Sequence, residues 1–213
     1  MRILVVGANG ALGRQIVERA VRAGHQVTAL VRRAESMEKR PDVCVVEGSV
    51  GEQLEVVASA IAGHDALLSG LGNHTWLRGG RTITVMAAAT ANLVTAMEAQ
   101  NVNRIVIPLA WGAGASRSAT SMPIRLITRG LMRHDFTDLD AAEQNLITAD
   151  LDWTIAYFGS LTNGAGTGHW TVNETLKRPL PLRVSRADVA DVLVSAVEHD
   201  RYRRQRVVLS RAQ

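Results

Sequence analysis

The sequence predicts a single α/β domain, built as a doubly wound parallel sheet with helices on both faces. Three observations support this fold class. Apolar runs rich in β-branched residues alternate with segments of helical periodicity along the chain. The first of these runs ends in glycines at fixed spacing. The chain has 213 residues, a length that suits one sizeable core, so we expect one domain over residues 1–213.

The first apolar run, residues 1–6, leads directly into Gly7-Ala-Asn-Gly10-Ala-Leu-Gly13. Gly7 can close a tight turn, Gly10 can let the backbone approach a pyrophosphate, and Gly13 can let the next helix pack close to the sheet. The phosphates would lie on the free N–H groups of the helix N-terminus. We therefore predict a dinucleotide site with contacts from Gly7, Asn9, Gly10, Ala11, Leu12 and Gly13. The alternative is a glycine-rich turn with only a structural role.

The end of the second strand indicates which dinucleotide is bound. Residues 11–23 have the periodicity of an amphipathic helix, and residues 25–31 form a second apolar strand. At this strand end an acid binds the ribose 2′-hydroxyl of NAD, whereas arginine binds the 2′-phosphate of NADP. The chain has Arg32 and Arg33 there, and no acid between Thr28 and Arg33. NADP(H) is the predicted cofactor, with solvated surface arginines as the alternative.

The alternation of strands and helices continues after Arg33. Short apolar runs predict strands at 43–46, 65–69, 104–107, 153–157 and 206–210. The segments between them predict helices at 52–62, 82–99, 138–149 and 186–198, the second of which is rich in alanine. This order indicates a mainly parallel sheet with ligands beyond the carboxyl ends of its strands. Gly72, Leu109, Ala110 and Phe158 fall at that edge.

Two stretches rich in small residues, 110–123 and 161–168, follow strands at the same edge. Long irregular segments in a compact domain are typical of binding loops or lids, with mobile surface as the alternative. The densest basic cluster, residues 201–206, lies between a predicted helix and the last strand. We expect it to be a solvated connection, with contact to an acidic partner or substrate as the alternative.

The composition argues against several classes of protein. The net charge is +4, but the arginines are spread over helix faces without zinc-finger spacing or a basic-aromatic stripe, so we expect no nucleic-acid partner. No apolar run approaches the ~20 residues of a membrane helix, and the first strand begins at once, leaving no room for a signal peptide. We expect a cytoplasmic protein with no membrane contact.

Cysteine and histidine usage gives two further expectations. The only cysteine, Cys44, cannot form an intrachain disulfide, which agrees with a reducing compartment. Its place in an apolar run predicts a small buried hydrophobic side chain. The histidines include no pair at metal-ligand spacing within a helix, so we expect no metal site.

The chain resembles the atypical short-chain dehydrogenase/reductase family, and within it the NAD(P)H-binding proteins similar to biliverdin reductase B and flavin reductase. The resemblance covers nearly the full length. It rests on the glycine turn, Val31-Arg32, Glu47-Gly-Ser-Val50, Gly70-Leu-Gly72, Glu143-Gln-Asn-Leu146, Leu151-Asp-Trp-Thr-Ile155 and Val184-Ser-Arg-Ala-Asp-Val-Ala190. It implies a single Rossmann-type domain.

The resemblance also implies roles for individual residues. Arg32 would hold the 2′-phosphate, and Ser49 and Val50 would border the adenine. Ser49 stands where the family usually has Asp, which weakens the adenine contact without removing it, because serine can still accept a hydrogen bond. Further contacts would come from Leu71 and Gly72 along the ribose and phosphates, and from Phe158, Gly159 and Ser160 beside the nicotinamide.

The catalytic residues of ordinary members are missing. Neither Tyr157 nor Tyr202 has lysine four residues on, so the Tyr-x-x-x-Lys pair is absent. Leu109-Ala110 also replaces the Thr-Ser of the biliverdin reductase B relatives. His134 is a weak candidate proton donor with Asp135 orienting it, and a helix start with Asp135 or Thr137 as N-cap is the alternative.

Two hypotheses accommodate this absence. In the first, the protein is an NADPH-dependent reductase whose acceptor is a flavin, a quinone or a similar conjugated molecule, which needs little proton help from the protein. Trp111, Phe158 and Trp170 are candidate stacking surfaces, with core or loop packing as the alternative. In the second, the protein binds NADP(H) without turnover, as a sensing or scaffold protein that acts through a partner. The alanine-rich helix fits a monomer or a homodimer equally well.

Overall fold

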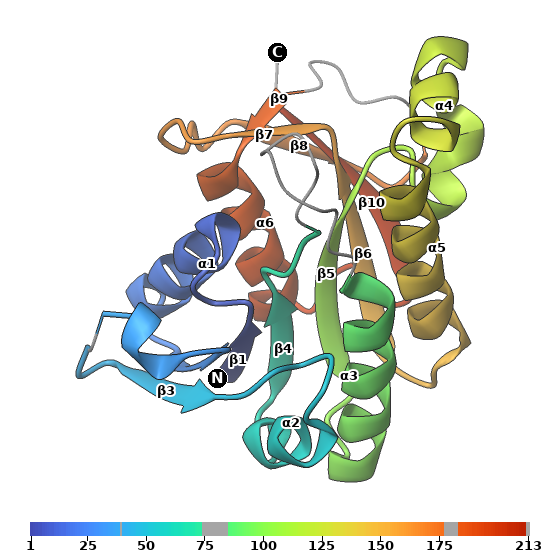
Figure 1. Ribbon diagram of the computed structural model, residues 1–213. Coiled ribbons are helices and arrows are strands. Elements are labelled where there is room, and N and C mark those ends of the chain that lie inside the picture. The colour runs from blue at the N-terminus through green and yellow to red at the C-terminus, as the bar shows by residue number, and fades with distance from the viewer. Residues whose placement is uncertain (39, 74–84, 177–182, 212–213) are drawn as a thin grey trace.

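The central feature of the computed structural model is one sheet of eight strands in the order β3-β2-β1-β4-β5-β6-β10-β8 (Figure 1). The model describes residues 1–38, 40–73, 85–176 and 183–211. Every neighbouring pair in the sheet is parallel except β10 with β8. The strands are β1 (Arg2–Val6), β2 (Gln26–Val31), β3 (Val43–Glu47), β4 (Ala66–Ser69), β5 (Arg104–Ala110), β6 (Asp152–Phe158), β8 (Trp170–Asn173) and β10 (Gln205–Arg211).

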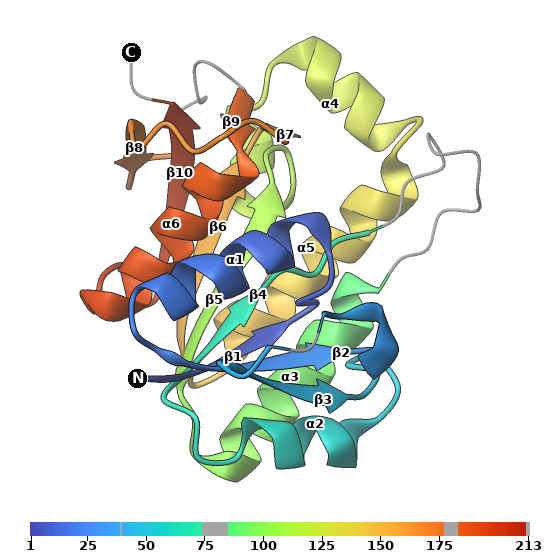
Figure 2. The same ribbon diagram turned by 90° about the vertical axis from the view of Figure 1, so that its left-hand side faces the viewer.

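Helices cover both faces of this sheet (Figures 1 and 2). α1 (Ala11–Arg22) and α6 (Arg186–Glu198) lie on one face, and α2 (Leu54–Ile61), α3 (Met86–Gln100) and α5 (Arg133–Thr148) lie on the other. Side chains of β1 alternate between the two cores, since Ile3 and Val5 pack with α1 and α6 whereas Leu4 and Val6 pack with the other helices. The predicted doubly wound α/β fold is confirmed.

The predicted elements occur in the predicted order, with small shifts at their ends. α6 has the predicted bounds, and of the helix expected at 82–99, residues 82–84 lie outside the described residues. β5 runs three residues past its predicted end, through Pro108 to Ala110. Proline is tolerated there because pairing of β4 with β5 ends at Val106, and beyond that point no strand in the described part of the chain pairs with this side of β5.

The stretch expected to be irregular at 110–123 contains ordered structure. A 3₁₀ helix, η3 (Gly114–Ala119), is followed by α4 (Met122–Arg129), whose proline in the first turn replaces an N–H that has no helical partner. α5 begins at Arg133, so Asp135 lies in its first turn and neither Asp135 nor Thr137 is the N-cap. Two short strands that pair with each other, β7 (Ser160–Thr162) and β9 (Arg183–Ser185), were also not predicted.

The predicted burial of Cys44 is wrong, because this side chain is exposed. β3 is an edge strand of the sheet, and its side chains point alternately to opposite faces. Val43 points inward and is buried, and Cys44 is next to it on the other face. An apolar run at a sheet edge therefore does not bury every residue in it.

The basic cluster at 201–206 is mostly exposed, as expected for a solvated connection, but its arginines also form ion pairs within the chain. Arg203 pairs with Asp152 and with Asp200, and Arg204 pairs with Asp150. Arg206, at the start of β10, bonds a buried glutamate on α5. These ion pairs join the cluster to neighbouring parts of the same chain.

Arg104, at the start of β5, is buried, and no carboxylate among the described residues pairs with it. Its guanidinium donates to the carbonyl oxygens of Asp152 at 2.8 Å, Ala196 at 3.2 Å and Arg201 at 2.8 Å, and to Thr154 Oγ1 at 2.8 Å. Burial lowers the pKa of Arg104 to about 10, well above neutrality. One charged side chain therefore joins β5, β6 and the end of α6 through neutral acceptors.

Replacing Arg104 by methionine is expected to lower the free energy of unfolding by roughly 2–4 kcal/mol, because several buried carbonyl groups lose their donor. Urea unfolding of the variant would measure this loss. The matched control is Arg201→Met, since the Arg201 side chain is exposed and only its carbonyl takes part in the contact. Equal unfolding midpoints for the two variants would contradict the structural role of Arg104.

Candidate functional site

The glycine turn after β1 brings three backbone segments into close contact. Gly7 has a positive φ of 67°, and its carbonyl accepts a 3.0 Å hydrogen bond from the Gly10 amide. A Cβ on Gly13 would overlap the Gly7 carbonyl and lie 2.8 Å from the Ala8 Cα. A Cβ on Gly70, just after β4, would lie 2.5 Å from the Gly13 Cα. Only glycines allow α1 to sit this close to the ends of β1 and β4.

The N-terminus of α1 has the features of an anion site. Gly10 is its N-cap, no side chain caps it, and its first turn contains no acid. Ala11 is exposed, whereas the Leu12 side chain is buried against the sheet, so Leu12 offers only its backbone to a ligand. Asn9 is held in place by Arg14, whose Nε donates to the Asn9 carbonyl and to Oδ1, both at 3.1 Å. The backbone N–H groups here can donate hydrogen bonds to a pyrophosphate.

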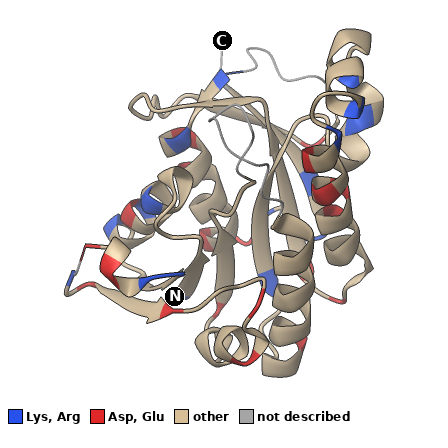
Figure 3. Ribbon diagram, in the orientation of Figure 1, with Lys and Arg blue, Asp and Glu red and all other residues tan. Residues whose placement is uncertain are grey.

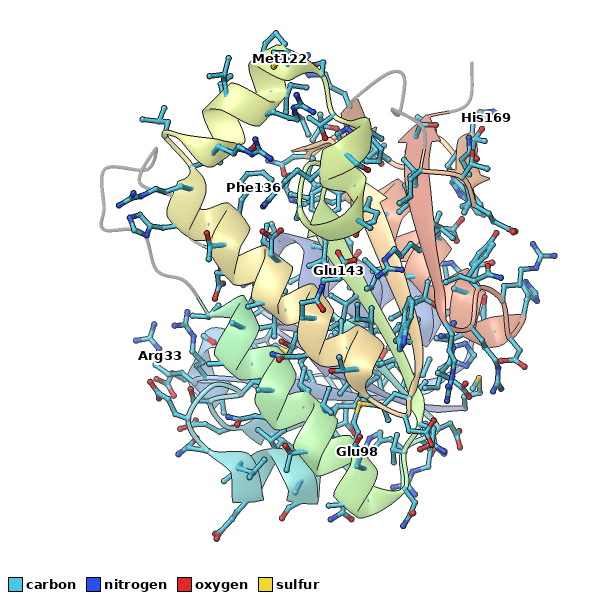
Figure 4. The ribbon with its side chains drawn as sticks, turned by 90° about the vertical axis from the view of Figure 1, so that its right-hand side faces the viewer. Arg33, Glu98, Met122, Phe136, Glu143 and His169 are labelled. Atoms are coloured by element: carbon cyan, nitrogen blue, oxygen red, sulfur yellow. The ribbon has the colours of Figure 1, made fainter. Side chains whose placement is uncertain are left out.

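Two arginines follow β2, next to this turn. Arg32 and Arg33 are both exposed, and neither side chain bonds any residue that the structure describes (Figure 4). The adjacent acid, Glu47 at the end of β3, accepts a 2.7 Å hydrogen bond from the Ala34 amide. That bond fixes the turn after Arg33, and the two guanidinium groups remain available for a phosphate.

The predicted adenine and ribose contacts lie at the carboxyl ends of β3 and β4. Ser49 is half-buried, and its amide donates to Gln53 Oε1 at 2.7 Å. Val50 is buried, and its carbonyl accepts from Asn92 Nδ2 at 2.9 Å. Leu71 is partly buried and Gly72 is exposed. These residues line the same sheet edge as the glycine turn.

The predicted nicotinamide segment lies at the carboxyl ends of β5 and β6. Ala110 pairs with Phe158, and the Trp111 amide donates to the Phe158 carbonyl at 2.7 Å. Leu109 is buried in the core, so only its backbone faces a ligand. Phe158 and Gly159 are half-buried, and Ser160 is exposed.

Two of the three candidate stacking rings pack within the protein. Trp111 is buried and meets the Tyr157 ring edge-on, with centroids 6.2 Å apart. Trp170 bonds Asp191 on α6 through its indole nitrogen at 2.9 Å. Phe158 and Trp170 are both half-buried at the carboxyl edge of the sheet, where Trp170 pairs with Arg211 at the end of β10, and Phe158 is the one whose ring has no hydrogen bond to a described residue.

Neither tyrosine of the chain can donate a proton to a ligand at this edge. Tyr157 is fully buried, and its hydroxyl donates to Glu143. Burial and the nearby Glu143 carboxylate raise the pKa of Tyr157, which keeps the phenol neutral. Tyr202 lies just before β10, which runs parallel to β6, so it is at the opposite edge of the sheet.

Glu143 is the centre of a buried polar network that sequence reasoning missed (Figure 4). It lies on α5, is 1% exposed, and accepts from Tyr157 Oη, from Arg206 Nε at 2.7 Å and from the Ala115 amide at 3.3 Å. Asp140, one turn earlier, accepts from the Gly114 amide at 2.7 Å. These carboxylates tie the segment after β5 to α5, so that segment is packed rather than a free loop. A glutamate among the apolar positions of α5 was the available signal, because a buried carboxylate needs partners.

The structure separates the two candidate proton-transfer residues. His134 is exposed and lines a cavity of about 520 Å³ between α3 and α5, together with Ala87, Arg133, Thr137, Asp138 and Ala141. Asp135 is 4% exposed, and among the described residues its Oδ1 has no hydrogen-bond partner. No hydrogen bond joins these two described side chains, as expected for consecutive helical residues, which face different directions. Asp138 instead caps α3, accepting from the amides of Met86 and Ala87 at 2.9 and 3.1 Å.

Burial, with the Asp138 carboxylate second, raises the pKa of Asp135. The folded state therefore binds this proton more tightly than the unfolded state, and the contribution of Asp135 to the free energy of unfolding decreases as pH rises from 3.8 through the folded pKa. We expect Asp135→Asn to be more stable than the parent at pH 7, with the difference shrinking toward pH 4. Urea unfolding across this range measures it, and a difference that does not depend on pH would contradict the assignment.

Comparison with known proteins gives one family and several relatives. A family model described as NAD(P)H-binding matches residues 7–200. The uncharacterized protein YwnB of Bacillus subtilis is 33% identical over 88 residues, 39% of this chain and 39% of that protein. An isoflavone reductase homolog of Zea mays is 32% identical over 137 residues, 59% of this chain and 40% of that protein. The matched regions thus span about two fifths of these relatives.

Solved structures share the fold. ChuY of Escherichia coli O157:H7, described as an anaerobilin reductase, superposes with a TM-score of 0.82 at 22% identity, over 99% of this chain and 97% of ChuY. Within the described ranges, no helix is both long and apolar enough to cross a membrane. The same ranges contain no group of three or more potential metal ligands.

Proposed function

This chain belongs to the NAD(P)H-binding family, and we propose that it is an NADPH-dependent reductase that transfers hydride to a flavin, a quinone or a similar conjugated acceptor. Membership of this family indicates a nicotinamide cofactor. The choice of NADPH and the class of acceptor are inferred from the residues around the site. Two similar proteins, the maize isoflavone reductase homolog and ChuY, are named as reductases, which supports a reductase activity.

The observation that carries the choice of NADPH is the pair of exposed arginines after β2. Arg32 and Arg33 make no bond within the described chain, and the nearby carboxylate of Glu47 is occupied by the Ala34 amide. A 2′-phosphate would supply the missing anionic partner, whereas a bare 2′-hydroxyl would leave both cations unpaired.

Replacing Arg32 by alanine is expected to raise the Kd of NADPH on the order of 10–100-fold, because a charge-assisted hydrogen bond to phosphate is lost. The Kd of NADH should change little. Fluorescence titration with both nucleotides measures the difference, and Arg22→Ala, an exposed arginine at the far end of α1, is the matched control. Equal weakening of the two nucleotides would contradict contact with the 2′-phosphate.

In this proposal the protein positions the cofactor and the acceptor, and it does not supply a proton donor. NADPH, when bound, supplies the hydride. The amides at the N-terminus of α1 hold the pyrophosphate, and the segment from Phe158 to Ser160 borders the nicotinamide. Both tyrosines are excluded by burial or by distance across the sheet. A conjugated ring needs little acid help, since it delocalises the transferred charge and takes its proton from water.

The direct test is NADPH oxidation, followed at the nicotinamide absorbance, with a panel of flavins and quinones and a simple ketone as the unconjugated control. We expect turnover with at least one conjugated acceptor and none with the ketone. Tight NADPH binding without turnover on any acceptor would overturn the reductase proposal.

That outcome would favour the second candidate function, an NADP(H)-sensing protein that acts through a partner. Two observations support it. Neither tyrosine can reach a ligand at the carboxyl edge of the sheet, whereas the glycine turn keeps the close backbone packing of a cofactor site. A partner bound only in the presence of NADP(H) would distinguish it from the reductase.

A further inference from the structure

An exposed apolar surface lies on α4 and the turn after it. In the part of the chain that the structure describes, six large hydrophobic side chains are exposed. Four of them fall within ten consecutive residues and are 51–68% exposed: Met122, Leu126, Ile127 and Leu131. We call these four side chains the α4 face. Isolated exposed apolar residues are ordinary on a protein surface, but a concentration of this kind marks a contact surface.

The α4 face combines the outer side of a short amphipathic helix with the turn that follows it. Thr128 is the only buried residue of α4. Met122 and Leu126 are four residues apart in the helix and so lie on one side of it, and Leu131 adds an exposed side chain from the turn. α4 stands at the margin of the domain, with Met122 at its outer end (Figures 2 and 4). The apolar side chains are therefore turned away from the core.

The charge around the α4 face has one sign. No Asp or Glu occurs in residues 99–134. Arg125 and Arg129 lie in α4 and Arg133 begins α5, and none of them forms an ion pair with a residue in the described ranges. Figure 3 shows Lys and Arg, but no Asp or Glu, along α4. Of the nearest acids on α5, Asp135 is buried, Asp138 caps α3 and Asp140 pairs with Arg117.

We propose that the α4 face binds an anionic lipid surface, with its apolar side chains inserted among the headgroups and its arginines on the lipid phosphates. Apolar residues beside unpaired cations are the pattern of a helix that lies in a membrane interface. A second copy of this chain fits less well, since a two-fold contact would bring the same arginines together without acids to pair them. This contact at the membrane surface departs from the expectation of no membrane contact. A helix that lies on the surface does not need the run of ~20 apolar residues that a spanning helix needs.

The proposal does not depend on the proposed reductase activity. α4 follows the carboxyl end of β5, so a membrane bound there would lie near the ligand edge of the sheet. The described chain has no helix able to span a bilayer, which agrees with attachment to its surface.

Co-sedimentation of the full chain with vesicles tests this inference. The probes are vesicles of phosphatidylglycerol mixed with phosphatidylcholine, and vesicles of phosphatidylcholine alone. We expect binding to the anionic vesicles at low salt, with weakening at high salt. Arg125→Gln/Arg129→Gln should reduce the partition coefficient on the order of tenfold or more, as should Leu126→Gln/Ile127→Gln.

Matched controls are Leu54→Gln, an exposed leucine on α2, and Arg22→Gln on α1, both of which should bind as the parent does. Circular dichroism and NADPH titration show whether each variant is folded. Absence of binding to anionic vesicles at low salt would overturn the proposal, as would unchanged binding of a folded Leu126→Gln/Ile127→Gln variant. A parent dimer in sedimentation equilibrium that this variant dissociates would assign the α4 face to a second copy instead.

Discussion

Replacing Gly13 by alanine is expected to destabilise the domain by roughly 3 kcal/mol and to abolish binding of NADPH and NADH alike. The new methyl group would overlap the Gly7 carbonyl oxygen and press on the Ala8 Cα at 2.8 Å. These are backbone atoms and cannot rotate away. α1 would have to move from β1, which would displace the amides proposed to bind the pyrophosphate.

Thermal or urea unfolding measures the first effect, and fluorescence titration with both nucleotides measures the second. Gly51→Ala is the matched control, because a Cβ there meets only Ala88, at an ordinary 3.9 Å, and its backbone needs no positive φ. This control should retain the parent's stability and cofactor affinity. A folded Gly13→Ala variant with normal affinity would show that close packing of α1 is not required for the site.

Replacing Glu143 by alanine is expected to lower the free energy of unfolding by about 3–5 kcal/mol. The carboxylate is the partner of Arg206, Tyr157 and the Ala115 amide in a buried site. Its removal leaves a half-buried guanidinium without an anion and releases the segment between β5 and α4. Urea unfolding measures the loss.

A double-mutant cycle separates the ion pair from the packing. Glu143→Leu alone leaves the Arg206 guanidinium without its carboxylate partner. Glu143→Leu/Arg206→Met removes both charges and replaces them with side chains of similar size. We expect the double variant to be more stable than the sum of the two single changes predicts. Additive effects would mean that the pair contributes no coupling energy. Tyr157→Phe should cost less, since it deletes a single donor.

The order of strands and helices along the chain could be predicted, apart from the short strands β7, β8 and β9, because each of the others is a short apolar run or has helical periodicity. The glycine turn and Arg32 were equally accessible, since their spacing is local. α4 was missed although Pro123 and Gly130 bracket it, because the stretch before it is rich in small residues and its apolar side chains face outward rather than into a core. β7, β8 and β9 depend on pairing between distant short segments, which no local period indicates.

The polar network around Glu143 could not be predicted either, because it also depends on residues that are distant in the sequence. Tyr157 and Arg206 lie 14 and 63 residues from Glu143 along the chain, and only the fold brings them together. Sequence could indicate that a glutamate at an apolar position of α5 needs partners, but not which ones. Likewise, β-strand periodicity alone did not show that Cys44 is on the open side of an edge strand.

The exposed Cys44 thiol is a single labelling site for spectroscopy. Cys44 is the only cysteine of the chain, so a maleimide dye or a nitroxide would attach at a single position without engineering. β3 pairs with β2, the strand that ends beside Arg32, so the label would report from the side of the sheet where we propose that the adenosine binds. Nucleotide exchange could then be followed in real time on the unmodified backbone, independently of whether any acceptor is reduced.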